Sequence, residues 1–189
     1  MVEDMTKLTS VIDEYIGDRG LVVVKAFEGS GGKQVYIDTP KNILKKDLPP
    51  FPLLLQTFID SSGGIADLAP GLHDLRVYAL GGKIIGGALR QPKEGSLYSN
   101  TNLGGNIKLL EEDDIPQAAK DMTIKIDSKL KKYRRFYSAD FMCANNKWYL
   151  IELNSKPGLC AKYQGSVGIR FQKELAAYMV SMADDPLKN

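Results

Sequence analysis

The 189-residue chain is poor in the residue types that identify several common classes of protein. It has one histidine, one tryptophan and two cysteines, Cys143 and Cys160. No C-x-x-C pair or Cys/His cluster occurs, so neither a zinc site nor a disulfide framework is indicated, and we expect a reduced, cytoplasmic protein. No apolar run approaches the ~20 residues of a membrane span, and the first residues lack the pattern of a signal peptide, so we expect no membrane partner.

The chain also lacks an excess of charge of one sign. It carries 25 lysine and arginine residues against 23 aspartate and glutamate residues, for a net charge of +2. The densest basic run, residues 129–135, lies at the end of an expected helix, where cations interact favourably with the helix dipole. Nothing resembles the basic stripe of a dedicated nucleic-acid binder, so we expect no nucleic-acid partner. The hydrophobic fraction of 43% suffices for one compact domain or two small lobes.

Antiparallel hairpins mixed with helices predict an α+β fold. Gly81-Gly82 marks a two-residue hairpin between two of the expected strands. The stretch 60–73, which contains Ser-Gly and Pro-Gly steps, is the candidate boundary between two lobes, and the loop 91–106 is long enough to favour a functional role. Strands are expected at 21–24, 34–37, 53–59, 75–80 and 83–90, and helices at 6–16, 40–46, 115–133 and 171–182.

The segment 138–154 is the most informative part of the chain. Two apolar strands flank Asn-Asn-Lys, so a hairpin with a three-residue turn at 145–147 is predicted, which sets Asp140 opposite Glu152. Alternation places Asn154 on the same face, and two carboxylates with an amide oxygen form the kind of site that Mg²⁺ prefers. A half-buried hairpin with its polar side chains in solvent fits the pattern equally well. The opposite face is expected to join the core through Phe141, Cys143, Tyr149, Ile151 and Leu153.

A glycine loop follows the first strand, at residues 28–33, Glu-Gly-Ser-Gly-Gly-Lys. Its backbone amides could approach phosphate oxygens closely, although surface turns are glycine-rich as well. Neither the Walker A pattern nor the dinucleotide fingerprint fits, because Gln34 stands where each needs another residue. Lys25 ends a Val-Val-Val strand, and its charge needs a partner, either a phosphate or an internal carboxylate.

Taken in order, these pieces resemble the ATP-grasp superfamily, most closely its RimK-like glutamate ligase and glutathione synthetase branch. The resemblance runs from about Gly20 to the C-terminus and implies two α+β lobes whose antiparallel sheets clamp ATP. The motifs that carry it are Val-Val-Val-Lys25, the glycine loop from Glu28, Leu-Gln56-Thr-Phe-Ile59, Asp74-Leu-Arg76, Arg90-x-x-Lys93-Glu94-Gly95, Ser99-Asn100, Gly104-Gly105, Asp140 and Glu152-Leu-Asn154.

The resemblance implies a set of nucleotide and metal contacts. Asp140, Glu152 and Asn154 would bind Mg²⁺, with Mn²⁺ as the alternative ion and two ions in the site. For Phe58 the strand position matters more than the side chain, whose ordinary role would be core packing. The nucleotide contacts implied are Lys25, Glu28, Gly29, Ser30, Gly31, Gly32, Gln56, Thr57, Phe58, Asp74, Ser99 and Asn100.

The implied reaction is that of an ATP-dependent carboxylate–amine ligase. The γ-phosphoryl group passes to a carboxylate, an amine attacks the acylphosphate, and an amide forms with release of ADP and phosphate. Arg90 would hold the transferring phosphoryl group, with Lys93 and Asn100 in support, whereas a plain surface charge is the alternative for Arg90. The partners implied are ATP, a carboxylate substrate and an amine acceptor, which could be an amino acid, a peptide or a protein terminus. The alternative function is a nucleotide-binding module without ligase activity of its own, either a regulatory or scaffold domain or a fragment that needs its N-terminal lobe.

The sequence departs from the family pattern in several places, one of which is the loop 60–73, longer than in close relatives. Residues 1–59 would form the small lobe with the glycine-rich loop and residues 60–189 the large lobe with the metal site and the C-terminal helix, without the N-terminal domain that usually precedes them. Tyr98 stands where RimK-like ligases carry arginine before Ser-Asn, and Lys156 stands where a small residue is usual. Several relatives form dimers or tetramers, so the resemblance also allows a homo-oligomer.

Overall fold

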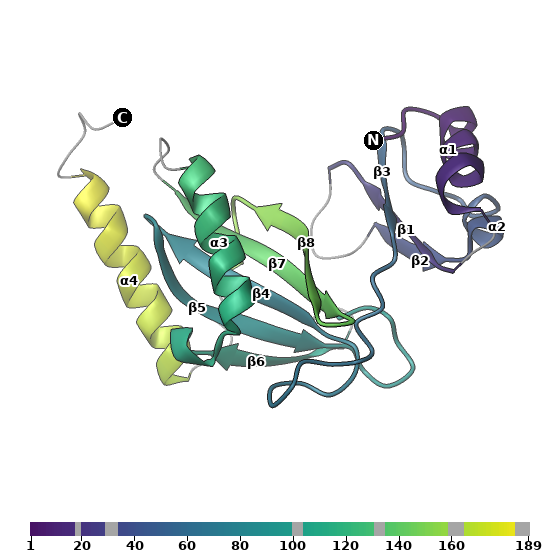
Figure 1. Ribbon diagram of the computed structural model, residues 1–189. Helices are drawn as coiled ribbons and strands as arrows, with labels where there is room; N and C mark the ends of the chain where they lie inside the picture. Colours follow the sequence, from purple (N-terminus) through teal and green to yellow (C-terminus); the bar gives the residue numbers. More distant parts are fainter. Residues whose placement is uncertain (18–19, 29–33, 100–103, 131–134, 159–164, 184–189) are drawn as a thin grey trace.

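A computed structural model of the protein describes residues 1–17, 20–28, 34–99, 104–130, 135–158 and 165–183 (Figure 1). It has an α+β fold with two antiparallel sheets, in strand orders β2-β1-β3 and β6-β5-β4-β7-β8. The strands are β1 (Val22–Ala26), β2 (Val35–Asp38), β3 (Leu53–Thr57), β4 (Asp74–Leu80), β5 (Lys83–Gln91), β6 (Asn106–Leu110), β7 (Phe136–Ala144) and β8 (Lys147–Asn154). The helical elements are α1 (Met5–Val11), the π-helical turn η1 (Ile12–Ile16), α2 (Pro40–Ile43), the 3₁₀ turn η3 (Glu112–Asp114), α3 (Gln117–Leu130) and α4 (Ser166–Ala183).

The three-stranded sheet packs against the first helix. The Asp4 carboxylate accepts a hydrogen bond from the Lys7 amide at 2.7 Å and so caps α1, and Gly17 ends η1 with a φ of 61°. Apolar side chains of the central strand β1 are buried against both helices of this part of the chain. The buried cluster consists of Val2, Leu8, Ile12, Val22, Val24, Ile43 and Leu53.

Helix α3 covers one face of the five-stranded sheet (Figure 1). Alternate residues of β4 and β7, such as Leu75, Val77, Ala139 and Phe141, form the core beneath it. The opposite face therefore carries the residues between them, and at one end of that face Phe171 of α4 packs on Tyr78 with ring centroids 5.5 Å apart. The apolar cluster beneath α4 does not extend to the start of β4. There, the same face of the sheet carries polar side chains.

Most of the predicted elements are confirmed, with shifted ends. The strands on either side of Gly81-Gly82 pair as expected, and both glycines have positive φ values. Strand β6 was missed, although Asn106–Leu110 alternates polar and apolar residues as strands do, because this short segment directly follows a glycine-rich loop. Helix α2 is shorter than expected and α4 begins five residues earlier, at Ser166. None of the helices in the described parts of the chain is long and apolar enough to cross a membrane.

The hairpin β7–β8 pairs Asp140 with Glu152 as predicted, but by a different route. Its turn has two residues, Asn145 and Asn146, with φ values of 50° and 61°, so the predicted three-residue turn is wrong. A two-residue turn alone would pair Asp140 with Ile151. A β-bulge next to Asp140 inserts Ile151 as an extra residue and restores the pairing with Glu152.

The prediction that the apolar residues of β8 join the core is wrong in part. Phe141 and Cys143 are buried, whereas the side chains of Tyr149 and Leu153 are 38% and 46% exposed. The reason is that β8 is the edge strand of the sheet, whereas the core beneath α3 is formed mainly by strands nearer the centre.

Candidate functional site

Four charged side chains form a compact ionic cluster on the face of the large sheet opposite α3. Strand pairing places Asp74 opposite Arg90 and Arg76 opposite Asp140. Arg76 donates from Nε and Nη2 to the two carboxylate oxygens of Asp140, at 2.8 and 2.7 Å. Arg90 donates from Nη2 to Asp74 Oδ1 at 2.5 Å and to Asp140 Oδ2 at 2.7 Å. Two cations and two anions are thus joined by charge-assisted hydrogen bonds in the order Asp74, Arg90, Asp140 and Arg76.

The surroundings fix the charges of this cluster. Burial by itself would raise the pKa of the Asp140 carboxyl, but Arg76 and Arg90 outweigh it and hold that pKa below its usual value. Burial raises the pKa of Asp74, and Arg90 offsets only part of this rise. For Arg90, burial is outweighed by the charges of Asp74 and Asp140, so its pKa rises and the guanidinium stays charged. Asp140 is therefore a permanent anion with two permanent cations beside it.

Lys25 brings a further positive charge from the three-stranded sheet toward this cluster. Burial lowers the pKa of the Lys25 ammonium, while the charges of Glu152, Asp74 and Asp140 act in the opposite direction. No ion pair within 4.0 Å joins Lys25 to any residue in the described parts of the chain. Carboxylates thus lie within electrostatic range of Lys25 without binding it directly, and its three N–H donors stay available to an anion.

The three predicted metal ligands occupy neighbouring positions on the β7–β8 hairpin. Asp140 pairs with Glu152, and Asn154 lies opposite Ser138. Glu152 is exposed, and it has no hydrogen bond or ion pair among the described residues. Within the described ranges, Asn154 Oδ1 accepts only the Lys156 amide, at 2.9 Å, and Asp140 Oδ1 accepts only Arg76 Nε. Each of the three residues therefore keeps an oxygen lone pair for a cation.

This donor set fits a hard divalent cation only if other ligands complete the coordination. Within the described residues no group of three or more His, Cys, Asp or Glu side chains could hold a metal ion. Two carboxylates with one amide oxygen form an open set, and Mg²⁺ usually completes such sets with water and phosphate oxygens. The residues fit Mg²⁺ bound together with a phosphate-bearing ligand better than a structural metal site.

The other predicted residues lie at the ends of strands or outside the described residues. Gln56 and Thr57 end β3, and the next amide, that of Phe58, donates to Leu21 O at 3.2 Å. Glu28 is exposed two residues after β1. Lys93 and Ser99 lie in the loop after β5. Gly29, Ser30, Gly31, Gly32 and Asn100 fall outside the described residues.

Two features of the site were not assigned from the sequence. Arg76 is the principal partner of Asp140, and a signal for it exists, because Arg76 follows Asp74 by two positions and so shares its face of the strand. His73 is fully buried; its Nδ1 donates to Gly71 O at 3.0 Å and its Nε2 accepts the Cys143 amide at 3.1 Å. Both nitrogens are thus used in the core, and His73 has a structural role.

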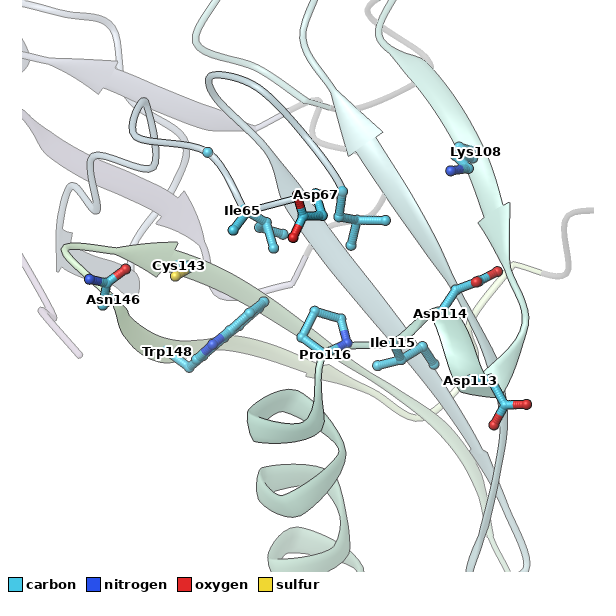
Figure 2. Close-up of a pocket in the computed structure, with 13 residues that line it drawn as sticks. Ile65, Asp67, Lys108, Asp113, Asp114, Ile115, Pro116, Cys143, Asn146 and Trp148 are labelled. Atoms are coloured by element: carbon cyan, nitrogen blue, oxygen red, sulfur yellow. The ribbon is translucent and has the colours of Figure 1, made fainter.

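A hollow in the surface lies elsewhere on the large sheet (Figure 2). It is formed by the loop 64–68, the segment 113–116 between η3 and α3, Lys108 and the side chains of Cys143, Asn146 and Trp148. Cys143 belongs to the core beneath α3, so the hollow opens on the face opposite the ionic cluster. It contains none of the residues predicted for the functional site.

The arrangement of the two antiparallel sheets and their helices is that of an ATP-grasp fold. The solved structure of the ATP-grasp ligase PsnB with a phosphomimetic variant of its minimal precursor, Mg and ADP matches with a TM-score of 0.58 and 15% identity, over 90% of this chain and 50% of that one. D-cycloserine synthetase DcsG matches with a TM-score of 0.58 and 14% identity, over 92% of this chain and 60% of that one. D-alanine–D-alanine ligase from Bacillus anthracis, complexed with ATP, matches with a TM-score of 0.56 and 15% identity, over 92% of this chain and 57% of that one.

The chain belongs to the RimK-like ATP-grasp domain family, whose model matches residues 1–179. A probable alpha-L-glutamate ligase of Maridesulfovibrio salexigens is 27% identical over 164 residues, which cover 82% of this chain and 48% of that protein. Another, of Hydrogenovibrio crunogenus, is 25% identical over 177 residues, covering 88% and 51%. The chain thus spans about half the length of these curated relatives. The predicted resemblance and the predicted α+β ATP-grasp fold are confirmed.

Proposed function

We propose that this chain is the ATP-binding core of a ligase that joins a carboxylate to an amine, with ATP as the energy source. The observation that carries the proposal is the position of Lys25, which extends from one sheet toward Asp74, Asp140 and Glu152 on the other without pairing with them. A cation within electrostatic range of three carboxylates that do not pair with it suits a Mg·phosphate ligand, because the phosphate would bind the cation and the metal would bind the carboxylates.

In the proposal the two sheets have separate tasks. Residues 1–59, the small lobe, hold the nucleotide through Lys25, the glycine-rich loop 28–33 and the end of β3. Residues 60–189, the large lobe, hold Mg²⁺ through Asp140, Glu152 and Asn154, with Mn²⁺ as the alternative and two ions in all. Bound Mg²⁺ supplies charge neutralisation for the phosphate oxygens. Asp74 keeps Arg90 in place, at 2.5 Å in this structure.

Arg90 has the geometry for exchanging one partner. Its Nη2 is shared between Asp74 and Asp140, and its Nε donates to Asp74 at 3.1 Å. If Arg90 releases Asp140, Arg76 still holds both oxygens of that carboxylate, and Arg90 Nη2 can donate to a phosphoryl oxygen instead. A guanidinium held on one side by Asp74 is oriented for a bidentate contact with an oxyanion. Lys93 and Asn100, in the loop that follows, are the supporting groups of the proposal.

The proposed reaction has two steps. A carboxylate oxygen of the substrate attacks the γ-phosphorus, the bond to the β–γ bridging oxygen breaks, and ADP leaves. The amine nitrogen then attacks the acyl carbon, phosphate leaves with the former carboxylate oxygen, and the amine releases a proton. Positioning and charge neutralisation contribute most of the rate, so no covalent protein group is needed. Glutamate is the first carboxylate or amine to test, because the relatives are named alpha-L-glutamate ligases.

The experiment that tests the proposal measures ADP release from Mg·ATP with amino acids, peptides and protein termini as acceptors. With an ¹⁸O-labelled carboxylate, the acylphosphate route transfers one ¹⁸O atom to the released phosphate. ADP release that depends on a carboxylate and an amine, with this transfer, supports the ligase. ADP release without ¹⁸O in the phosphate overturns the acylphosphate step.

A nucleotide-binding module without ligase activity of its own is the second candidate, favoured by one observation. The chain spans about half the length of its curated relatives, so groups that bind the substrates could lie outside it. Binding of Mg·ATP without ADP release over the whole panel supports this candidate. Homo-oligomer formation and a cytoplasmic location stay part of the proposal and are tested by sedimentation and by localisation of a tagged chain.

A further inference from the structure

One side chain of the large sheet's loop reaches across to the edge of the small sheet. The hydroxyl of Tyr98 accepts a hydrogen bond from the backbone amide of Ile37 in β2, at 3.2 Å, and the two residues are 61 positions apart. Both residues are partly buried at this contact. This hydrogen bond between the two sheets is specific, because its donor is a backbone N–H that has no partner within its own sheet.

The pairing of β1 with β2 explains why the Ile37 amide is available. In an antiparallel pair, residues alternate between positions that exchange hydrogen bonds and positions that do not. Ala26 and Gln34 form a hydrogen-bonded position at one end of the pair, because the Ala26 amide donates to Gln34 O at 3.1 Å. Counting in steps of two along the register makes Tyr36 a bonded position and Ile37, opposite Val23, a position whose N–H points away from β1. Strand β2 is an edge strand, so only a group from outside the sheet can accept this N–H.

The loop that carries Tyr98 is held in shape by its own contacts. The Ser96 amide donates to Lys93 O at 3.0 Å, and the Tyr98 amide donates to Ser96 Oγ at 3.1 Å. The two ends of the loop meet at Gly105, where a Cβ atom would lie 2.7 Å from Ser99 O and 2.9 Å from Gln91 O. We therefore expect a displacement of Tyr98 to move Lys93 and Ser99 as well, because these contacts restrict the loop.

We propose that Tyr98 is a positioning residue that ties the loop carrying Lys93 and Ser99 to the sheet carrying Lys25, and thereby sets the spacing of the two sides of the nucleotide site. Ile37 lies opposite Val23, two residues before Lys25 on β1. The hydrogen bond from Ile37 to Tyr98 thus joins the two parts of the proposed site close to both of them. This proposal rests on the proposed function, because it assigns the spacing to a nucleotide held between the sheets.

The chemistry of the position makes the role specific to tyrosine. The Ile37 N–H needs an acceptor, and the phenol oxygen supplies one. Arginine, the residue usual at this position in the family that the sequence resembles, has five N–H donors and no acceptor. Arginine at position 98 cannot accept a hydrogen bond from the Ile37 amide, so Tyr98→Arg should lose the contact.

The test compares Tyr98→Phe, Tyr98→Arg and wild type, with Tyr15→Phe as the matched control. Tyr15 is 74% exposed in η1, far in sequence from both sides of the contact. The first measurement is hydrogen exchange at the Ile37 amide, by NMR and without nucleotide. The second is the dissociation rate of a fluorescent Mg·ADP analogue, with the KM for ATP and kcat measured wherever turnover is found.

Loss of one hydrogen bond predicts about 3- to 10-fold faster exchange at Ile37 in both Tyr98 variants, while the bonded Tyr36 amide and the Tyr15→Phe protein behave as wild type. Nucleotide dissociation should accelerate by a similar factor in Tyr98→Phe, with a rise in KM larger than the fall in kcat. Unchanged exchange at Ile37 overturns the contact. Faster exchange with unchanged nucleotide dissociation overturns the positioning role. If wild type binds no Mg·ADP, the proposed function fails and the positioning role fails with it, whereas exchange at Ile37 still decides the contact.

Discussion

Arg76 and Asp140 form a bidentate ion pair across β4 and β7, with both hydrogen bonds between 2.7 and 2.8 Å. The pair is largely buried, with side chains 14% and 4% exposed. Because Arg90 also donates to Asp140, this carboxylate has two cationic partners and can release one without being left unpaired. The pair therefore anchors Asp140 in the orientation that the proposed magnesium site requires.

Replacement of Arg76 by alanine should destabilise the fold strongly. Removing one partner of a buried ion pair typically costs about 3–5 kcal/mol, because the other charge stays buried with less compensation, and Arg90 should reduce this cost toward the lower end. Urea unfolding of Arg76→Ala measures the change. The comparison variant is Lys46→Ala, which removes the exposed Lys46–Asp38 pair and should cost much less, because solvent screens such pairs. Equal losses in the two variants would contradict the structural role given to Arg76.

Replacement of Lys25 by methionine should separate binding from stability. Burial lowers the pKa of Lys25, which shows that the environment disfavours its charge, so a methionine should leave the free energy of unfolding unchanged or higher. The affinity for Mg·ATP should fall by roughly 10- to 100-fold, the worth of a charge-assisted contact. Lys45→Met, on an exposed lysine after α2, is the matched control. A Lys25→Met protein that binds Mg·ATP as wild type does would remove Lys25 from the site.

The turn of the β7–β8 hairpin should tolerate glycine and reject β-branched residues. Asn145 and Asn146 both have positive φ values, a conformation that costs most other residues about 1–2 kcal/mol. Asn145→Val should lower the free energy of unfolding by that amount, and Asn145→Gly should leave it nearly unchanged. Thermal or urea unfolding of the two variants decides the point. A harmless Asn145→Val substitution would argue against the two-residue turn.

The stability of the protein should depend on His73 at mildly acid pH. Burial lowers the pKa of His73 below 6.5, and its Nε2 must stay unprotonated to accept the Cys143 amide. The unfolded chain therefore binds this proton more readily than the folded one, so stability is complete above about pH 6.5 and is lost as the pH falls below it. The chain has a single histidine, so His73→Gln, which can still accept and donate, should flatten the stability profile between about pH 6.5 and 5. An unchanged slope in that variant would contradict this assignment.

Local sequence patterns predicted the strand positions of several candidate site residues, since strand periodicity follows directly from the chain. Alternation along one strand was sufficient to place Glu152 with Asn154, and the glycine pair at 81–82 was sufficient to predict a hairpin. The bulge at Ile151 could not be predicted, because a bulge depends on how β7 is fixed by its other neighbour, β4. The pairing of Asp140 with Glu152 was thus predicted for a reason that was only partly right.

Other contacts depend on which strands become neighbours. Arg76 meets Asp140 because β4 lies between β5 and β7, an order that no local pattern contains. Tyr98 meets Ile37 across two different sheets, and the sequence indicated only that the tyrosine was unusual at its position. The exposure of Tyr149 and Leu153 likewise follows from the place of β8 at the edge of the sheet.

The most direct test of the proposed nucleotide site is calorimetric titration of Mg·ATP into wild type, Glu152→Ala and Glu112→Ala. Glu152 is the exposed carboxylate of the proposed metal set, and Glu112 is an exposed glutamate in η3 without a part in it. We predict saturable binding to wild type that requires Mg²⁺, the same affinity for Glu112→Ala, and at least a ~10-fold loss for Glu152→Ala, as expected for removal of a charged ligand. Absence of binding to wild type, or equal binding by all three proteins, would contradict a Mg·ATP site on the β7–β8 hairpin.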